Sequence, residues 1–121
     1  MISKIACTSI LTFVAAVSLV STADASTRYD GRWSLSIVTT RGTCSTYNFP
    51  VAITNGFVSF PGLVKARGRV TAKGSVSVFV AAGEKSASGS GRLTVGSGSG
   101  RWSGRSGNDR CSGTWTAERS S

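Results

Sequence analysis

The sequence predicts an all-β protein, an eight-stranded antiparallel meander that forms a small barrel or a tight sandwich with one disulfide, after an N-terminal signal peptide. Three observations carry this prediction. Beyond residue 26, apolar residues alternate with polar ones in one short run after another, and no run has helical periodicity. Turn-forming residues separate the runs at hairpin spacing. Two cysteines in this region are placed to link distant runs.

The first 25 residues have the pattern of a secretory signal peptide. Lys4 supplies a positive start, residues 5–20 form an apolar stretch diluted by serine and threonine, and residues 23–25 are an A-x-A cleavage site. The apolar stretch is shorter than the roughly 20 residues that a membrane span needs, which makes an uncleaved anchor the weaker alternative. We expect residues 26–121 to form one secreted or periplasmic domain without a transmembrane span.

The predicted cleavage removes Cys7 and leaves Cys44 and Cys111 as a pair in an oxidising compartment, where pairing is the default. Closing a loop of 67 positions stabilises a fold by roughly 4 kcal/mol in the chain-entropy model. That contribution matters because a domain of 96 residues buries only a modest core. We expect a structural disulfide, since the chain has no histidine and no companion ligands that would make the two thiols a metal site.

Each predicted strand rests on apolar or small residues two positions apart, which share one face. Sequential antiparallel order with all these faces on one side favours closure, because closure removes exposed sheet edges. The eight sets, in chain order, are Trp33, Leu35 and Ile37; Tyr47, Phe49, Val51 and Ile53; Val58 and Phe60; Val64, Ala66, Gly68 and Val70; Val76, Val78 and Val80; Ala87, Gly89, Gly91, Leu93 and Val95; Trp102 and Gly104; and Cys111, Gly113, Trp115 and Ala117.

Tight turns are predicted at 40–42, 55–56, 72–74, 83–84 and 108–109, and a flexible turn at 96–100. Asn55-Gly56 is the strongest of these signals, because both residues tolerate positive φ, and it places Ile53 opposite Val58. The turn at 72–74 likewise places Val70 opposite Val76.

One predicted register requires an irregularity. The turn at 40–42 pairs Leu35 with Tyr47, and this register points Cys44 away from the side on which its partner lies. We expect a one-residue bulge at 45–46 that turns Cys44 and Tyr47 to the inner side.

Tryptophan recurs in Gly-x-Trp-Ser/Thr phrases at 31–34, 100–103 and 113–116. We expect the three indoles to fill interior space left by alanine and glycine on other strands, because a barrel this small is usually filled by its own side chains. The alternative is an aromatic-lined pocket, which would make the protein a carrier of a small apolar ligand.

The outward face carries the candidate binding residues. In the predicted registers Phe57, Arg67 and Phe79 lie side by side on three strands, with Lys65 and Arg69 two residues along the middle strand. An arginine between exposed rings makes cation–π contacts worth about 0.5–1 kcal/mol. The cluster is either purely structural or a partner site, where rings stack and cations attract an anionic or sugar-rich surface.

The charge favours a polyanionic partner. The formal net charge is +9, and thirteen basic and four acidic residues remain once Lys4 and Asp24 leave with the signal peptide. Export disfavours nucleic acid and favours lipopolysaccharide, acidic exopolysaccharide or phospholipid headgroups as the anion. A charge that serves only solubility is the alternative.

Enzyme motifs are missing from the sequence. It has no histidine, no S-x-x-K nucleophile and no G-x-S-x-G in a strand-to-helix context. The four carboxylates of the mature chain stand at turns or near the termini: Asp30, Glu84, Asp109 and Glu118. We expect no catalysis, no cofactor and no metal site.

The phrases at 29–33, YDGRW, and at 111–119, CSGTWTAER, resemble a group of small exported proteobacterial proteins, and the similarity spans Tyr29 to Arg119. Some members of this group carry names linked to haem utilisation or adhesion. The resemblance implies an exported protein with a surface-associated or haem-related role. Without histidine, a haem iron would have to be held by Tyr29 or Tyr47.

Together these observations predict an exported, non-catalytic binding or surface-associated protein. The leading hypothesis is contact with an anionic envelope or extracellular glycan through the outward basic and aromatic residues. The alternatives are a barrel carrier of a small apolar ligand, and a structural or adhesion exoprotein that meets copies of itself or another protein.

Overall fold

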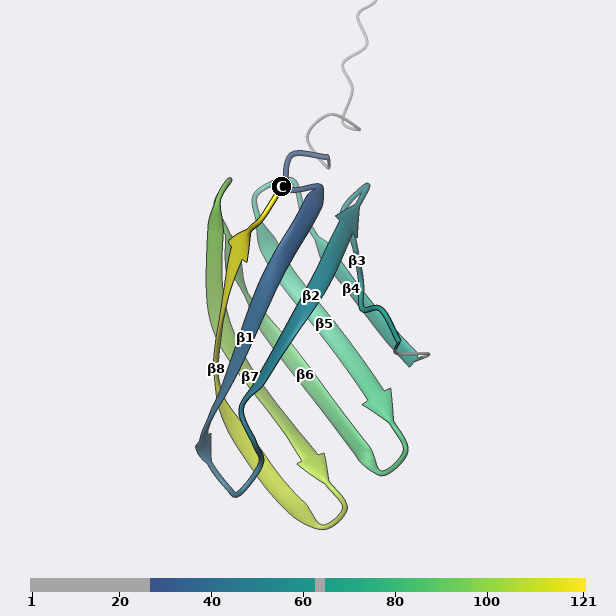
Figure 1. The fold of residues 1–121 in the computed structure, drawn as a ribbon, viewed down its shortest axis with the longest axis vertical. Coiled ribbons are helices and arrows are strands. Elements are labelled where there is room, and N and C mark those ends of the chain that lie inside the picture. The colour runs from purple at the N-terminus through teal and green to yellow at the C-terminus, as the bar shows by residue number, and fades with distance from the viewer. Residues whose placement is uncertain (1–26, 63–64) are drawn as a thin grey trace, which may run out of the picture.

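The computed structural model describes residues 27–62 and 65–121; the predicted signal peptide and the predicted inward residue Val64 lie outside these ranges. The described chain forms eight strands that pair antiparallel in sequence order, and the last pairs with the first to close a barrel (Figure 1). The predicted all-β meander is confirmed in its barrel form. The strands are β1 (Gly31–Arg41), β2 (Tyr47–Thr54), β3 (Phe57–Ser59), β4 (Lys65–Val70), β5 (Ser75–Ala82), β6 (Lys85–Leu93), β7 (Ser97–Ser106) and β8 (Asp109–Arg119).

The hairpin turns follow the local chemistry of the sequence. Asn55 and Gly56 take φ values of 53° and 81°, as a type I′ turn requires, and Ile53 faces Val58 as predicted. The predicted Val70–Val76 pair and the turn at 83–84 are also present. The last turn lies at 107–108 instead of 108–109, because the first position of this turn needs positive φ and Gly107 supplies it at 64°.

The register between β1 and β2 differs from the prediction by two residues. Leu35 pairs with Phe49 and not with Tyr47, because the connection runs over 42–46 and is longer than the predicted turn. No bulge forms at 45–46; the irregularity lies instead between Thr39 and Arg41, where β1 pairs with β8. Because Cys44 lies in this longer connection and not in a strand, the direction of its side chain is not set by strand alternation.

The predicted disulfide between Cys44 and Cys111 is present, with Cα atoms 6.1 Å apart. It ties the connection between β1 and β2 to the start of β8. Gly42 makes the close approach possible, since its φ is 94° and a Cβ there would lie 2.4 Å from the carbonyl oxygen of Arg110.

The glycine-rich segment at 96–100 is mostly strand, whereas the sequence predicted a flexible turn. The turn between β6 and β7 spans 94–96, so Val95 lies outside the predicted inward set and is exposed. Two glycines on β6 and β7 are required by close packing. A Cβ on Gly91 would lie 2.2 Å from the carbonyl oxygen of Ser99, and one on Gly100 would lie 2.0 Å from that of Ser90; each would also lie 2.6 Å from the Trp115 indole.

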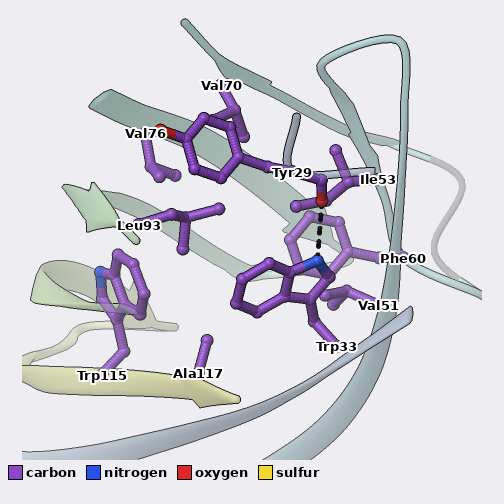
Figure 2. Packing of buried hydrophobic residues seen from close by; sticks show 10 residues of the cluster. All are labelled: Tyr29, Trp33, Val51, Ile53, Phe60, Val70, Val76, Leu93, Trp115 and Ala117. Atoms are coloured by element: carbon purple, nitrogen blue, oxygen red, sulfur yellow. Dashed lines mark hydrogen bonds between the residues drawn. The ribbon is translucent and has the colours of Figure 1, made fainter. Parts of the chain in front are cut away.

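The buried core gathers at one end of the barrel, which we call the closed end (Figure 2). Tyr29, from the segment before β1, lies against the core there, and its carbonyl oxygen accepts a 2.9 Å hydrogen bond from Trp33 Nε1. Trp33 is the most buried large side chain, at 1% exposure. The other members of this core are Val51, Ile53, Phe60, Val70, Val76, Leu93, Trp115 and Ala117.

Arg119 and Asp30 hold backbone segments together at the closed end through hydrogen bonds. The Arg119 guanidinium donates hydrogen bonds to the carbonyl oxygens of Val95, Arg28 and Asp30, and lies 5.2 Å from the centre of the Trp33 ring. The Asp30 carboxylate accepts hydrogen bonds from the backbone N–H groups of the turn at 55–56, at 2.7 Å and 3.2 Å. The two sequence phrases that carry the family resemblance therefore meet in space, in a structural role.

Candidate functional site

Beyond the closed end, the barrel interior is hollow. A cavity of about 250 Å³ is lined almost wholly by apolar side chains and extends to residues beside the β5–β6 and β7–β8 turns, at the end of the barrel that we call the open end. Its lining combines members of the buried core, such as Trp33 and Trp115, with half-buried side chains from opposite sides of the barrel. The main wall residues are Leu35, Ile37, Phe49, Val58, Val78, Val80 and Trp102.

We expected the three indoles to fill the interior, and this expectation is wrong for the part of the barrel nearer the open end. Trp33 and Trp115 are buried, at 1% and 6% exposure. Trp102 is half-buried, and its Nε1 donates a 2.9 Å hydrogen bond to the carbonyl oxygen of Val38. All three indoles line the cavity, together with small residues such as Ala87 and Gly89; Trp115 Nε1 lies 3.6 Å from the position of a Cβ on Gly89.

Two positively charged residues border the cavity at the open end. Lys85 and Arg105 are the charged residues among its lining, and no carboxylate belongs to it. Tyr47 also lines the cavity and stacks on Phe49, with ring centroids 5.9 Å apart and an interplanar angle of 14°. The disulfide lies at this end as well, through Cys44.

Sequence reasoning missed Lys85 as a site residue, although the signal was present. The inward set on its strand begins at Ala87, and the same alternation extended by two positions reaches Lys85. In the barrel Lys85 pairs with Ala82 and Ser106, which also line the open end.

Four of the five predicted binding residues lie together on the outer face. Phe57 and Phe79 are 55% and 40% exposed, so both rings point outward as predicted. The Arg69 guanidinium lies 5.2 Å from the Phe57 ring centre, and that of Arg67 lies 6.0 Å from the Phe79 ring centre. Phe57 pairs with Arg69 and not with Arg67, which corrects the predicted order.

Lys65 does not join this cluster. It pairs with Ala81 at the start of β4, whereas the other four residues line an open groove on the outer face. The groove continues over β5 to β8, where Arg101 and a strip of hydroxyl side chains form its floor and walls. These hydroxyl residues are Ser77, Ser88, Ser90, Ser103, Ser112 and Thr114.

The residues available for metal or haem chemistry are few. Among residues 27–62 and 65–121, no group of three or more His, Cys, Asp or Glu side chains is placed to hold a metal ion. Of the two tyrosines considered as haem ligands, Tyr29 is buried at the closed end and Tyr47 lines the cavity. In the same described ranges, no helix has the length and hydropathy needed to cross a membrane.

No family model, curated protein or solved structure matches the chain. The resemblance to exported proteobacterial proteins thus stays a prediction.

Proposed function

We propose that this protein is a non-catalytic binding protein that holds a small apolar molecule inside its barrel. The observation that carries the proposal is the apolar cavity of about 250 Å³ inside the barrel. Apolar cavities of about 150 Å³ already bind benzene, and pockets for larger ligands begin near 300 Å³. The size therefore suits a ligand somewhat larger than a single aromatic ring.

The surrounding structure supports a preformed site. Tyr29, Trp33 and the Arg119 hydrogen bonds hold the closed end, and the disulfide restrains the connection beside the open end. A site that is already ordered spends little binding free energy on ordering side chains. Each methylene group that the ligand buries then contributes about 0.8 kcal/mol.

The test is a fluorescence titration of the oxidised domain with the neutral apolar dye N-phenyl-1-naphthylamine. Val80→Phe fills part of the cavity, since Val80 is half-buried in its wall. The matched control is Val95→Phe, at an exposed turn position. We expect saturable binding that Val80→Phe weakens at least tenfold and Val95→Phe leaves unchanged. Equal binding by both variants, or none by the wild type, would refute the proposal.

We also propose a second function for the outer face, contact with an anionic envelope component or extracellular glycan after export. The observation that favours it is the pair of exposed Arg–Phe contacts at the edge of a groove rich in hydroxyl groups. Exposed rings supply stacking area and guanidinium groups pair with acidic sugars. A disulfide is also typical of proteins in a secreted or periplasmic location.

Retention on immobilised lipopolysaccharide or acidic polysaccharide tests this second function. Arg67→Ala removes a cation from the groove, and Arg92→Ala removes one that does not line it. We expect retention that falls with added salt and is weaker for Arg67→Ala than for Arg92→Ala. Retention that ignores salt, or two variants that behave alike, would exclude a specific role for this face.

A further inference from the structure

We infer that the molecule held in the barrel is a single-chain aliphatic anion, with a fatty carboxylate as the specific proposal: its chain lies in the cavity and its carboxylate meets Lys85 and Arg105 at the open end. This inference rests on the proposed apolar-ligand function and adds the chemical class of the ligand. A purely apolar ligand would leave the charge at the cavity entrance without a role.

The position of Lys85 carries the first step. Paired residues in neighbouring strands project to the same face, and Lys85 pairs with Ala82 and Ser106, both part of the cavity lining. Ala87, two positions further along β6, also lines the cavity. Lys85 thus stands on the inner face at the entrance, where its aliphatic stem can cover apolar wall while its ammonium group stays in water.

Arg105 supplies the second cation, one position before Ser106 on the neighbouring strand β7, and it borders the cavity. It pairs with Ser86 of β6 and Arg110 of β8, so strand alternation places it on the outer side of the rim, next to the inner-face position of Lys85. A guanidinium group presents paired N–H donors that match the two oxygens of a carboxylate. Ser106, which pairs with Lys85 on the inner face, carries a hydroxyl group that is a further donor.

Two acidic residues lie at the same end of the barrel. Glu84 lies in the β5–β6 turn beside the β7–β8 turn, where its carbonyl oxygen accepts a 3.1 Å hydrogen bond from Gly107 N–H. Asp109 pairs with Ser106 across that second turn and therefore projects to the same face as Ser106. Neither residue belongs to the cavity lining, whose charged members are Lys85 and Arg105.

The size and the apolar lining of the cavity favour one kind of anion. The cavity of about 250 Å³ has room for one short chain and none for a two-chain lipid, and its walls offer apolar contacts and few polar partners. A single aliphatic chain with its charge at one terminus satisfies both regions at once. A rigid polyanion would leave the apolar walls unused, and a neutral hydrocarbon would leave the cations unused.

The experiment compares octanoate, octyl sulfate and 1-octanol by isothermal titration calorimetry with the oxidised full-length mature domain. The chains match, so differences report the head group. We test wild type, the double variant Lys85→Met/Arg105→Gln, and the control Lys73→Met/Arg92→Gln, which makes the same charge change at positions outside the cavity lining. Methionine keeps an unbranched apolar stem in place of that of lysine. Far-UV circular dichroism confirms that each variant is folded.

We expect wild type and control to bind octanoate more tightly than 1-octanol, by on the order of fivefold for two solvent-exposed charge contacts. The Lys85→Met/Arg105→Gln variant should lose that difference and keep its affinity for 1-octanol. Added salt should weaken octanoate binding alone. Tighter binding of octyl sulfate than of octanoate would overturn the carboxylate assignment.

The negative results distinguish failure of the anion inference from failure of the apolar-ligand function. Equal binding of octanoate and 1-octanol by the wild type would overturn the anion inference and leave the apolar-ligand function standing. No binding of any octyl compound or of the neutral dye would overturn both. A preference for octanoate that survives in the Lys85→Met/Arg105→Gln variant would show that other residues recognise the head group, and would also refute the inference.

Discussion

Replacing Arg119 by lysine is predicted to destabilise the closed end while keeping the charge. The guanidinium group contacts three backbone carbonyl oxygens and lies over the Trp33 ring. A lysine keeps one of these hydrogen bonds at most, because its ammonium group is compact and cannot span several acceptors as a planar fork does.

The expected loss follows from these contacts. Hydrogen bonds from charged donors contribute about 1.5–3 kcal/mol each when desolvated, and the two to Val95 and Arg28 are solvent-exposed and count for much less. Together with about 0.5 kcal/mol for the exposed cation–π contact, we expect Arg119→Lys to lower the free energy of unfolding by roughly 2 kcal/mol. For a domain of this size that corresponds to a fall in Tm of about 10 °C.

Urea unfolding followed by tryptophan fluorescence measures this change, and Arg92→Lys on exposed β6 is the control. The control should shift the free energy of unfolding by less than about 0.5 kcal/mol. If Arg119→Lys unfolds at the same urea concentration as the control, the hydrogen bonds that join β8 to the segment before β1 and to the β6–β7 turn do not stabilise the fold, and the structural role given to them is wrong.

Two further predictions concern stability. Replacing both Cys44 and Cys111 by alanine should lower the free energy of unfolding by about 4 kcal/mol in the chain-entropy model, measured in urea against the oxidised wild type; an unchanged midpoint would contradict this. Gly100→Ala should destabilise by more than about 2 kcal/mol, because its Cβ would lie 2.0 Å from the carbonyl oxygen of Ser90 and 2.6 Å from Trp115 Nε1, while Gly96→Ala meets nothing within 4 Å. Thermal unfolding of the two alanine variants compares them, and equal Tm values would show that the neighbouring strand and the indole move aside freely.

The phrases at 29–33 and 111–119 meet in the structure. The first contributes the Tyr29 ring, the Asp30 carboxylate and the Trp33 indole, and the second contributes Arg119. These groups lie at the closed end, and of the four only Trp33 also lines the cavity.

Alternation and turn residues were enough to predict the strands and most of their pairings. They act locally: Asn55-Gly56 selects a type I′ turn wherever it occurs, and Val76, Val78 and Val80 share a face because side chains alternate along any strand. The β1–β2 register was missed because the connection at 42–46 has no comparable turn signal, and its path depends on where Cys111 lies. The strand at 97–100 was missed because its glycines are required by residues on other strands: Leu93 beside Gly98, and Ser90 and Trp115 beside Gly100.

The candidate site was likewise predictable from the sequence only in part. Outward exposure of Phe57 and Phe79 follows from strand parity, so the sequence alone placed the basic and aromatic face. It also determined the antiparallel all-β meander and the disulfide, while the structure decided between a barrel and a sandwich. Only the tertiary structure decided that the barrel is packed at one end and hollow at the other, with Lys85 at the entrance. A cavity is the difference between the volume that the backbone encloses and the volume that side chains from many strands fill, and no local pattern in the sequence contains that difference.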